Sequence, residues 1–260
     1  KTDSYGTSTY SYDGAGRVIK AEMPGKTSIY AYDKAGNRVS MIETYASAQS
    51  SGFVDESGTA VEYTLKESQY VYSACNRLVM LVEEMYDGDV KVLTRTVQYT
   101  YDANGNQLTE YASFTHPNNS NYRRTISASV YGDMQQSAPD LLIDRTVNTY
   151  DGFNRLVRTE KVEAGVRTVA EYVYDGDDLR TKKTVRKSDN GYVPDVTYFL
   201  YDRQHVILET DGNNGVKARY IRGINYIAQY SGSSGTSLMY FLYNGHGDVV
   251  QTVTASGEVQ

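Results

Sequence analysis

The chain has no tryptophan, one cysteine and four prolines among its 260 residues. The lone Cys75 rules out a disulfide framework within the chain and a metal site built from several cysteines, and we interpret it as a small turn residue. No apolar run approaches the roughly 20 residues that a membrane-spanning helix needs. The 26 basic and 32 acidic residues are well mixed, without a basic stripe, so nucleic-acid binding is not expected. The sequence begins at Lys1 without Met or a signal peptide, and we expect a mature chain or a fragment of a longer protein.

Signatures of the common catalytic and cofactor sites are also missing. The sequence contains no G-x-S-x-G, no H-E-x-x-H and no Gly-rich phosphate loop. His116, His205 and His246 are isolated, and we interpret them as turn or surface residues rather than bases. The acidic residues 175–178 (DGDD) are the best metal candidate but lack the ligand series of a calcium loop. We therefore expect no enzyme, no catalytic residue, no cofactor and no bound metal.

Tyrosine, by contrast, is abundant, with 26 residues, and it follows a repeated pattern that residues 99–109 (YTYDANGNQLT) show well. Two aromatic residues at i and i+2 lie on one face of a β-strand, and Tyr is a good strand former. The pattern therefore predicts a strand that ends at each second tyrosine. The motif tyrosines are Tyr10, Tyr12, Tyr30, Tyr32, Tyr70, Tyr72, Tyr99, Tyr101, Tyr150, Tyr172, Tyr174, Tyr201 and Tyr243.

Four residues typical of a turn follow each motif. The first can accept a hydrogen bond from the backbone N–H two residues on, and it is Asp13, Asp33, Ser73, Asp102, Asp151, Asp175, Asp202 or Asn244. The fourth belongs to a type that tolerates positive φ, and it is Gly16, Gly36, Asn76, Gly105, Asn154, Asp178, His205 or Gly247. A type I turn followed by a left-handed residue is a common hairpin connection, so we predict eight hairpins of shared geometry.

The spacing of the motifs predicts further turns on the opposite edge of the same sheet. These turns lie at residues 23–26, 86–89, 164–165, 188–191, 211–215 and 231–235, and residues 220–225 are expected to form a degenerate ninth turn of the first kind. Insertions are predicted near residues 46–60 and 112–140. In the first insertion, residues 55–58 form either a degenerate turn or part of a loop. The predicted fold is all-β, a meander of antiparallel hairpins that forms a curved, spiralling sheet.

The motifs YSYDGAGRV (10–18), YAYDKAGNRV (30–39), YTYDANGNQL (99–108) and TYDGFNRLV (149–157) resemble the YD repeat of the Rhs (rearrangement hotspot) family. Residues 209–260 resemble the start of the Rhs-associated core, so the resemblance divides the chain into a repeat array (1–208) and a core segment (209–260) continuous with the same sheet. It implies that the sheet is part of a hollow β-shell. In bacterial members such a shell encloses the C-terminal toxin of the same polypeptide. Related shells occur in the C subunits of insecticidal toxin complexes and in teneurins.

The sequence departs from the family in one respect. The family's core ends with Asp-Pro motifs associated with self-cleavage, whereas the four prolines here follow Met23, His116, Ala138 and Val193. We therefore expect shell wall alone, without the cleavage element or the toxin. The predicted partners are that toxin or effector domain and flanking shell segments, with a receptor or glycan as a further possibility, in a secreted or bacterial cell-surface protein.

The function that the resemblance implies is encapsulation and presentation of a toxin. The alternative from another class is a cell-surface adhesion or carbohydrate-binding module built on the same shell. A third alternative is a hydrolase with paired carboxylates, although nothing in the sequence selects a pair.

Two structural expectations complete the sequence analysis. Six motif tyrosines should be mostly buried, stack against tyrosines of adjacent hairpins and have bonded hydroxyls: Tyr12, Tyr32, Tyr72, Tyr101, Tyr174 and Tyr201. The first strand, near residues 7–13, and the last, near 249–254, should present unpaired backbone groups at the edges of an open, curved sheet.

Overall fold

The computed structural model describes residues 2–3, 6–54, 60–115, 123–124, 144–163, 165–232 and 237–259. Almost all of them belong to β-strands or tight turns, so the all-β prediction is confirmed. The strands are β1 (Thr2–Asp3), β2 (Gly6–Thr7), β3 (Thr9–Tyr12), β4 (Val18–Met23), β5 (Lys26–Tyr32), β6 (Arg38–Val54), β7 (Ala60–Tyr72), β8 (Leu78–Asp87), β9 (Val90–Tyr101), β10 (Gln107–Thr115), β11 (Arg123–Arg124), β12 (Asp144–Tyr150), β13 (Leu156–Glu163), β14 (Val166–Tyr174), β15 (Arg180–Lys187), β16 (Asp195–Asp202), β17 (His205–Thr210), β18 (Val216–Arg222), β19 (Tyr226–Ser231), β20 (Ser237–Tyr243) and β21 (Val249–Thr254). A 3₁₀ turn, η3, covers Ser188–Asn190.

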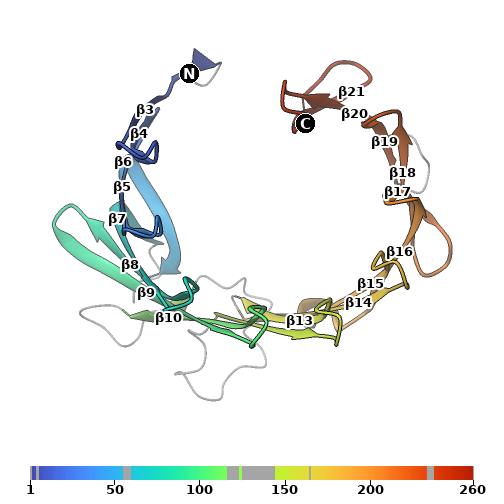
Figure 1. The fold of residues 1–260 in the computed structure, drawn as a ribbon, viewed down its shortest axis with the longest axis horizontal. Helices are drawn as coiled ribbons and strands as arrows, with labels where there is room; N and C mark the ends of the chain where they lie inside the picture. Colours follow the sequence, from blue (N-terminus) through green and yellow to red (C-terminus); the bar gives the residue numbers. More distant parts are fainter. Residues whose placement is uncertain are drawn as a thin grey trace. The chain divides into compact units, whose positions relative to one another are not determined.

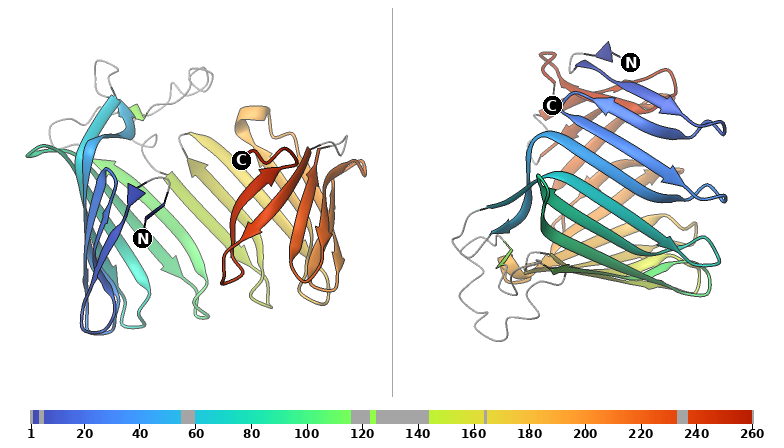
Figure 2. Two further views of the ribbon diagram at one scale, coloured as in Figure 1. Left: turned by 90° about the horizontal axis from the view of Figure 1, so that it is seen from above. Right: turned by 90° about the vertical axis from the view of Figure 1, so that its left-hand side faces the viewer.

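The chain divides into two compact units (Figures 1 and 2), unit 1 with Lys1–Asn148 and Glu160–Arg167 and unit 2 with Thr149–Thr159 and Thr168–Gln260. In unit 1, strands β3 to β10 pair antiparallel in chain order and β10 also pairs with β12. In unit 2, strands β14 to β21 pair in the same serial way. Each unit is therefore a meander in which every hairpin pairs with the next.

The pairing between successive hairpins has a constant register. Val18 pairs with Tyr12 across the first loop, and two residues later Lys20 pairs with Ile29, which lies three residues before Tyr32. The equivalent pairs between later hairpins are Ser40 with Gln69, Met80 with Gln98, Thr109 with Val147, Lys182 with Tyr198, Leu208 with Arg219 and Ala228 with Tyr240. Within each unit, the motif tyrosines therefore occupy the same place beside the preceding hairpin.

A β-bulge accompanies eight of these loops. Ser11 pairs with Lys20 while the next residue, Tyr12, pairs with Val18, so the return strand carries one extra residue beside the loop. The same shift occurs next to Tyr32, Tyr72, Tyr101, Tyr174, Tyr201, Arg222 and Tyr243. Bulges increase the local twist of a strand, so each hairpin brings its own twist to the sheet.

The buried core of the described residues is thin. Its buried hydrophobic residues are Ala21, Val61, Met85, Leu93, Val97, Ala112, Val169, Ala170, Ala218 and Ala228, half of them alanines. Val61, Met85 and Leu93 form a small cluster in unit 1, partly covered by Tyr63. The stabilisation from hydrophobic burial scales with the apolar area buried, and small side chains bury little. Polar contacts between the strands therefore contribute an unusually large part of what holds the hairpins in register.

The turns predicted on the opposite edge are confirmed where the structure describes them. Gly25 (φ 75°), Gly88 (φ 56°) and Gly191 (φ 67°) lie in the turns at residues 23–26, 86–89 and 188–191. The turn at 211–215 is present, and the ninth turn separates β18 from β19. Of the turns at 164–165 and 231–235, Ala164 and residues 233–235 lie outside the described residues.

The insertion predicted near residues 46–60 is part of a strand rather than a loop as far as Val54, because β6 continues to that residue. Its pairing with β7 shifts register between Thr44 and Gln49 and again between Ser50 and Val54, so β6 carries extra residues in this stretch. The candidate turn at residues 55–58 lies outside the described residues. Of the predicted insertion at 112–140, residues 112–115 belong to β10 and 123–124 to β11, and the other residues lie outside the described part of the chain.

Candidate functional site

The loop that follows the first motif is closed by both the backbone and the side chain of Asp13. The Asp13 N–H donates to the Arg17 carbonyl (2.9 Å), and the Gly16 N–H donates to the Asp13 carbonyl (3.0 Å). The Asp13 Oδ1 atom accepts from the N–H groups of Ala15 and Arg17, each at 2.9 Å. One carboxylate therefore satisfies two backbone donors that the turn leaves free.

The same two backbone bonds recur in the loops that begin at Asp33, Ser73, Asp102, Asp151 and Asn244, and the Asp175 loop has the first of them, from the Asp175 N–H to the Leu179 carbonyl. Positive φ is found where it was predicted, at Gly16, Gly36, Asn76, Gly105, Asn154, Asp178 and Gly247. The prediction for His205 is wrong. Asp202 pairs directly with His205, so the turn consists of residues 203–204 alone, and the left-handed residue is Arg203, with φ 56°.

Two loops on the opposite edge have this same chemistry, which the sequence analysis did not recognise. Asp211 Oδ1 accepts from the N–H groups of Asn213 (2.8 Å) and Gly215 (2.7 Å). The Thr254 N–H donates to the Glu258 carbonyl, and the Thr254 hydroxyl accepts from the Glu258 N–H. The signal was available, because DGNNG and TASGE both place a short oxygen-bearing side chain at the first loop position.

Four loop carboxylates, those of Asp13, Asp33, Asp102 and Asp151, have lowered pKa values because they accept these hydrogen bonds. Bonds from the backbone and side chain of Arg17 lower the pKa of Asp13. The Asn37 side chain lowers that of Asp33 in the same way. At Asp151, burial alone would raise the pKa, but bonds from Arg155 reverse this effect. These acids are therefore ionised at neutral pH and committed to the loop.

The tyrosine hydroxyls connect each hairpin to the one before it. The Tyr32 hydroxyl donates to the Val18 carbonyl (2.8 Å), and Val18 is the residue that pairs with the previous motif tyrosine, Tyr12. The equivalent bonds run from Tyr72 to Arg38 (3.0 Å), Tyr101 to Leu78 (2.7 Å), Tyr174 to Leu156 (2.8 Å), Tyr201 to Arg180 (2.9 Å), Tyr226 to Val206 (3.0 Å) and Tyr243 to Tyr226 (2.6 Å). We call this contact the tyrosine stitch.

The burial of the stitch tyrosines agrees with the prediction for five of the six residues. Tyr32, Tyr72, Tyr101, Tyr174 and Tyr201 are half-buried. The prediction is wrong for Tyr12, which is 58% exposed, because among the described residues no hairpin of the same sheet precedes β3 to cover the ring. At the ninth turn the stitch is made by Tyr226, from the return strand, since position 222 carries Arg. The sequence analysis missed Tyr226.

Arginines rather than tyrosines cover the rings of Tyr32, Tyr101 and Tyr174, so the expected stacking is wrong for these three residues. Arg17 lies over Tyr32 (4.8 Å to the ring centroid), Arg77 over Tyr101 (5.8 Å) and Arg155 over Tyr174 (5.2 Å). Each arginine comes from the last position of the preceding loop. A guanidinium over an aromatic ring is attracted by the ring quadrupole, so the same contact that orders the ring also joins two loops.

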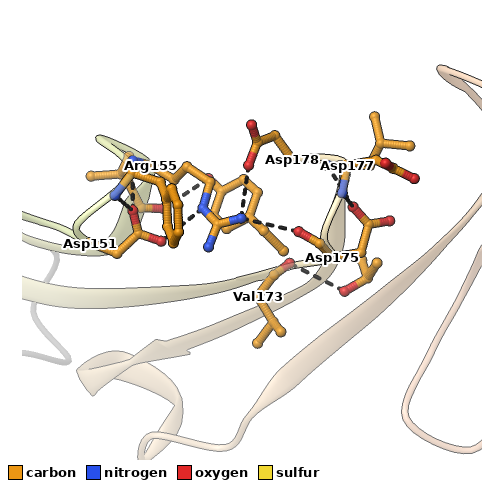
Figure 3. A network of polar contacts seen from close by, with 11 residues as sticks. Asp151, Arg155, Val173, Asp175, Asp177 and Asp178 are labelled. Atoms are coloured by element: carbon orange, nitrogen blue, oxygen red, sulfur yellow. Dashed lines mark hydrogen bonds and ion pairs between the residues drawn. The ribbon is translucent and has the colours of Figure 1, made fainter.

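Figure 3 shows the fullest version of this arginine contact, around Arg155. Its Nε donates to Asp151 Oδ2 of its own loop (2.8 Å), and its Nη1 donates to the Asp175 carbonyl (3.1 Å) and to Asp178 Oδ1 (2.9 Å) of the next loop. Arg17 and Arg77 donate to the carbonyls of Asp33 (3.1 Å) and Asp102 (3.0 Å) in the same manner. The sequence signal that was missed is the recurrence of Arg or Asn at the fifth loop position: Arg17, Asn37, Arg77, Asn106 and Arg155.

Unit 1 also contains a ladder of alternating charges that crosses five strands. Lys66 on β7 lies between Glu43 on β6 (2.7 Å) and Glu83 on β8 (3.6 Å), and Lys26 and Arg95 (2.5 Å) pair with the outer sides of the two glutamates. Burial alone would lower the pKa of Lys66, but the hydrogen bond to Glu43 and the charges of both glutamates raise it. Burial would raise the pKa of Glu43, and the two lysines lower it. Lys66 and Glu43 are therefore both charged at neutral pH.

The residues considered for chemistry are dispersed or already engaged. Asp175 Oδ1 accepts from the N–H groups of Asp177 and Leu179, and Asp178 pairs with Arg155, so the acidic stretch serves its loop. Within the described ranges, no group of three or more His, Cys, Asp or Glu side chains is arranged to hold a metal ion. Cys75 is exposed in the loop at residues 73–77. His116 lies outside the described residues. Among the residues that the structure describes, no helix is long and apolar enough to cross a membrane.

These features define an antiparallel β-hairpin repeat protein in which a tyrosine, a loop carboxylate and a loop arginine recur together. No family model matches the chain, and no curated protein matches it. Among solved structures, the chain is similar to a chain of the Photorhabdus luminescens Tc holotoxin pore carrying a TccC3 mutation, with 12% identity and a TM-score of 0.47. The likeness covers 96% of this chain and 13% of that chain.

Proposed function

We propose that this chain is a non-enzymatic wall segment of an Rhs/YD-repeat protein, a β-shell that encapsulates and presents a C-terminal toxin or effector domain of the same polypeptide. The observation that carries the proposal is the distribution of the motif residues. A binding or catalytic site needs a few polar groups that converge in one place. Here the same contact is repeated from hairpin to hairpin along each unit, which suits a wall.

The state of the motif side chains supports this interpretation. The Tyr174 hydroxyl is bonded to a backbone carbonyl and its ring is covered by Arg155, which is itself bound to Asp151 and Asp178. A side chain that is fully engaged within its own fold has little left for a substrate. The repeated residues are thus committed to joining hairpins, and the proposed work is containment rather than chemistry.

The proposal includes the partners and the location. The enclosed effector domain and flanking shell segments of the same polypeptide are the partners, and a secreted or cell-surface protein is the setting. The resemblance of the YD motifs to the repeat of the Rhs family supports the proposed partners and the proposed location.

Protection of the cargo tests the proposal directly. The natural polypeptide that contains this segment would be digested with a protease under native conditions, and mass spectrometry would follow peptides from the domain after the repeats. We expect those peptides to resist cleavage in the wild type and to be released in a Gly105→Val variant that opens the wall, with Gly14→Val, where the added side chain meets open space, as the matched control. Equal cleavage of that domain in all three proteins would contradict encapsulation.

A carbohydrate-binding module is the second candidate, and the exposure of several aromatic rings favours it. Tyr198 and Tyr240 in unit 2 are 41% and 38% exposed, and aromatic rings are common stacking platforms. A glycan array probed with the purified chain separates the two functions. Saturable binding that a Tyr240→Ala substitution removes would support the module and count against a purely structural wall.

A further inference from the structure

Asparagine is followed directly by glycine at four places in the chain, residues 104–105, 190–191, 214–215 and 244–245. Such a pair is prone to deamidation, because glycine has no side chain to hinder attack of its own backbone nitrogen on the asparagine amide. All four asparagines are exposed. Exposure therefore does not distinguish the four pairs, whereas the hydrogen bonding of the glycine nitrogen does.

Three of the four glycine N–H groups donate a hydrogen bond within their own turn. These bonds run from Gly105 to the Asp102 carbonyl (3.1 Å), from Gly191 to the Ser188 carbonyl (3.3 Å) and from Gly215 to Asp211 Oδ1 (2.7 Å). The nitrogen must lose its proton and turn toward the amide carbon before it can attack. A hydrogen bond opposes both steps, because it holds the proton and fixes the plane of the peptide.

Gly245 differs because it is the second residue of its loop. Asn244 Oδ1 accepts from the N–H groups of His246 (2.9 Å) and Asp248 (3.0 Å), and the Asn244 carbonyl accepts from the Gly247 N–H (3.1 Å). The loop thus has acceptors for its third, fourth and fifth N–H groups. No residue that the structure describes accepts from the Gly245 N–H, and nothing lies within 4 Å of the place where a Cβ would stand.

We propose that Asn244 is a site of spontaneous deamidation, selected among the four pairs by the hydrogen-bond pattern of its loop. The Gly245 nitrogen bonds to Asn244 Cγ, and the bond from Cγ to Nδ2 breaks. Ammonia leaves with the proton that the nitrogen has lost. Water then opens the resulting succinimide, at Cγ to give aspartate or at the backbone carbonyl to give isoaspartate. The reaction is independent of whether the wall encloses a cargo.

The aspartate loops with a glycine at the same second position are protected in another way. Asp13 and Asp151 both precede glycine, and both carboxyl groups have lowered pKa values. They are therefore ionised at neutral pH, and a carboxylate is a poor target for a nucleophile. The uncharged amide of Asn244 lacks this protection.

Either product would weaken the closure of the loop. In the loop at residues 33–37 the carboxylate of Asp33 accepts from the Asn37 amide (2.9 Å). Here the order is reversed, and the Asn244 amide donates to Asp248 Oδ2 (3.2 Å). Aspartate at position 244 would bring two like charges together. Isoaspartate would add a carbon to the main chain inside the ring closed by the Asn244 N–H and the Asp248 carbonyl (3.0 Å).

Peptide mapping of the aged chain tests the selection of the site. The purified chain is kept folded at mildly alkaline pH, and mass spectrometry follows the conversion of amide to carboxyl in the four peptides. We expect Asn244 to react at least several-fold faster than each of the other three asparagines. In urea the four rates should converge, since glycine follows every one of them. Equal or faster reaction of another pair in the folded chain, or an unchanged preference for Asn244 in urea, would overturn the proposal.

A matched variant tests the attacking atom. Gly245→Ala should slow the reaction at Asn244 several-fold by hindering the attack. The loop should tolerate this change, because Ala74 and Ala103 occupy the second position of two other loops. Equal rates in the wild type and the variant would refute attack by the Gly245 nitrogen.

Hydrogen exchange on the same samples tests the consequence for the loop. The N–H groups of His246 and Asp248 should exchange several-fold faster as the wild-type chain ages, in proportion to the modified fraction. In Gly245→Ala they should change much less over the same time. Constant exchange in a fully modified wild type would contradict the predicted opening of the loop.

Discussion

The hairpins of unit 1 and two hairpins of unit 2, β16–β17 and β18–β19, make the same stitch with different loops. Unit 1 uses five-residue loops closed by Asp13, Asp33 or Asp102, whereas the turns of unit 2 at residues 203–204 and 223–225 are shorter. The stitches from Tyr201 and Tyr226 are nevertheless present, and so is the register of the strands. The tyrosine contact and the register are therefore the invariants of this fold, and the loop chemistry is replaceable.

The two units also differ in how their charges are used. In unit 1 the side chains of Glu43 and Lys66 are only 5% and 17% exposed. In unit 2 the pair between Arg186 and Glu171 is 38% and 45% exposed. Exposed ion pairs contribute little because water and salt screen them, while a buried charge depends on its partner. The contacts of the Glu43–Lys66 ladder should thus be far more sensitive to substitution than the exposed pair of Arg186 and Glu171.

The largest predicted effect is a loss of stability on substituting Lys66, and it tests the difference between the buried and the exposed ion pairs. Lys66→Met leaves two buried glutamates without their shared cation and should lower the free energy of unfolding by about 3 kcal/mol. Arg186→Met should cost less than about 1 kcal/mol. Urea denaturation followed by circular dichroism measures both. In the double variant Lys66→Met/Glu43→Gln, part of the loss should be recovered, and equal costs at Lys66 and Arg186 would break the comparison.

The next effect concerns the loops. Gly105 has φ 95°, and a side chain there would also approach the Arg77 guanidinium at 3.0 Å. Gly105→Val should destabilise unit 1 by about 1–3 kcal/mol because a β-branched residue resists that conformation. Gly223→Val, in the short turn of unit 2, meets only the flexible end of Ile227 at 3.3 Å and should cost less. A larger loss at Gly223 would show that the short turns are not the more tolerant ones.

The tyrosine stitch should contribute the same free energy of stabilisation in both units. Tyr32→Phe and Tyr243→Phe each remove one hydrogen bond to a backbone carbonyl and should each cost about 1 kcal/mol. Hydrogen exchange measured on peptides from the neighbouring strands locates the loss. If Tyr243→Phe proved silent while Tyr32→Phe did not, the stitch would not be an invariant of the whole chain.

The smallest effect is a pH dependence of the aspartate loops. The pKa of Asp33 is lowered by its bond from Asn37, so its contribution is present above the ordinary pKa of about 3.9 and is lost as pH falls through the lower folded value. Protection of the residues 33–37 loop should therefore decline between about pH 4 and pH 2. Asp33→Asn should flatten this dependence, since Asn244 closes its loop with an uncharged side chain. An unchanged slope in the variant would contradict the assignment.

The hairpin turns could be predicted because they depend on residues that are close in the sequence. The contacts between hairpins could not, because they join residues that are far apart in the sequence. The requirement for positive φ at Gly16 or Asn154 is set within five residues, so the sequence alone suffices. The contact between Arg17 and Tyr32, and the ladder of Glu43 and Lys66, join residues far apart in the chain, and only the register brings them together. His205 was mispredicted because a turn one residue shorter fits the same spacing, and Tyr226 was missed because it works from the opposite strand.

The constant register has a consequence for how such a chain can vary. Because each hairpin is aligned with its neighbour at the loop edge, differences in length accumulate at the other edge, as the 17 residues of β6 beside the 7 of β5 show. A strand can gain or lose residues in pairs there without turning any side chain to the other face. Hairpins of unequal length can therefore replace one another in the sheet. Recombination at a point between one acceptor carbonyl and the next tyrosine would leave all the other tyrosine stitches intact.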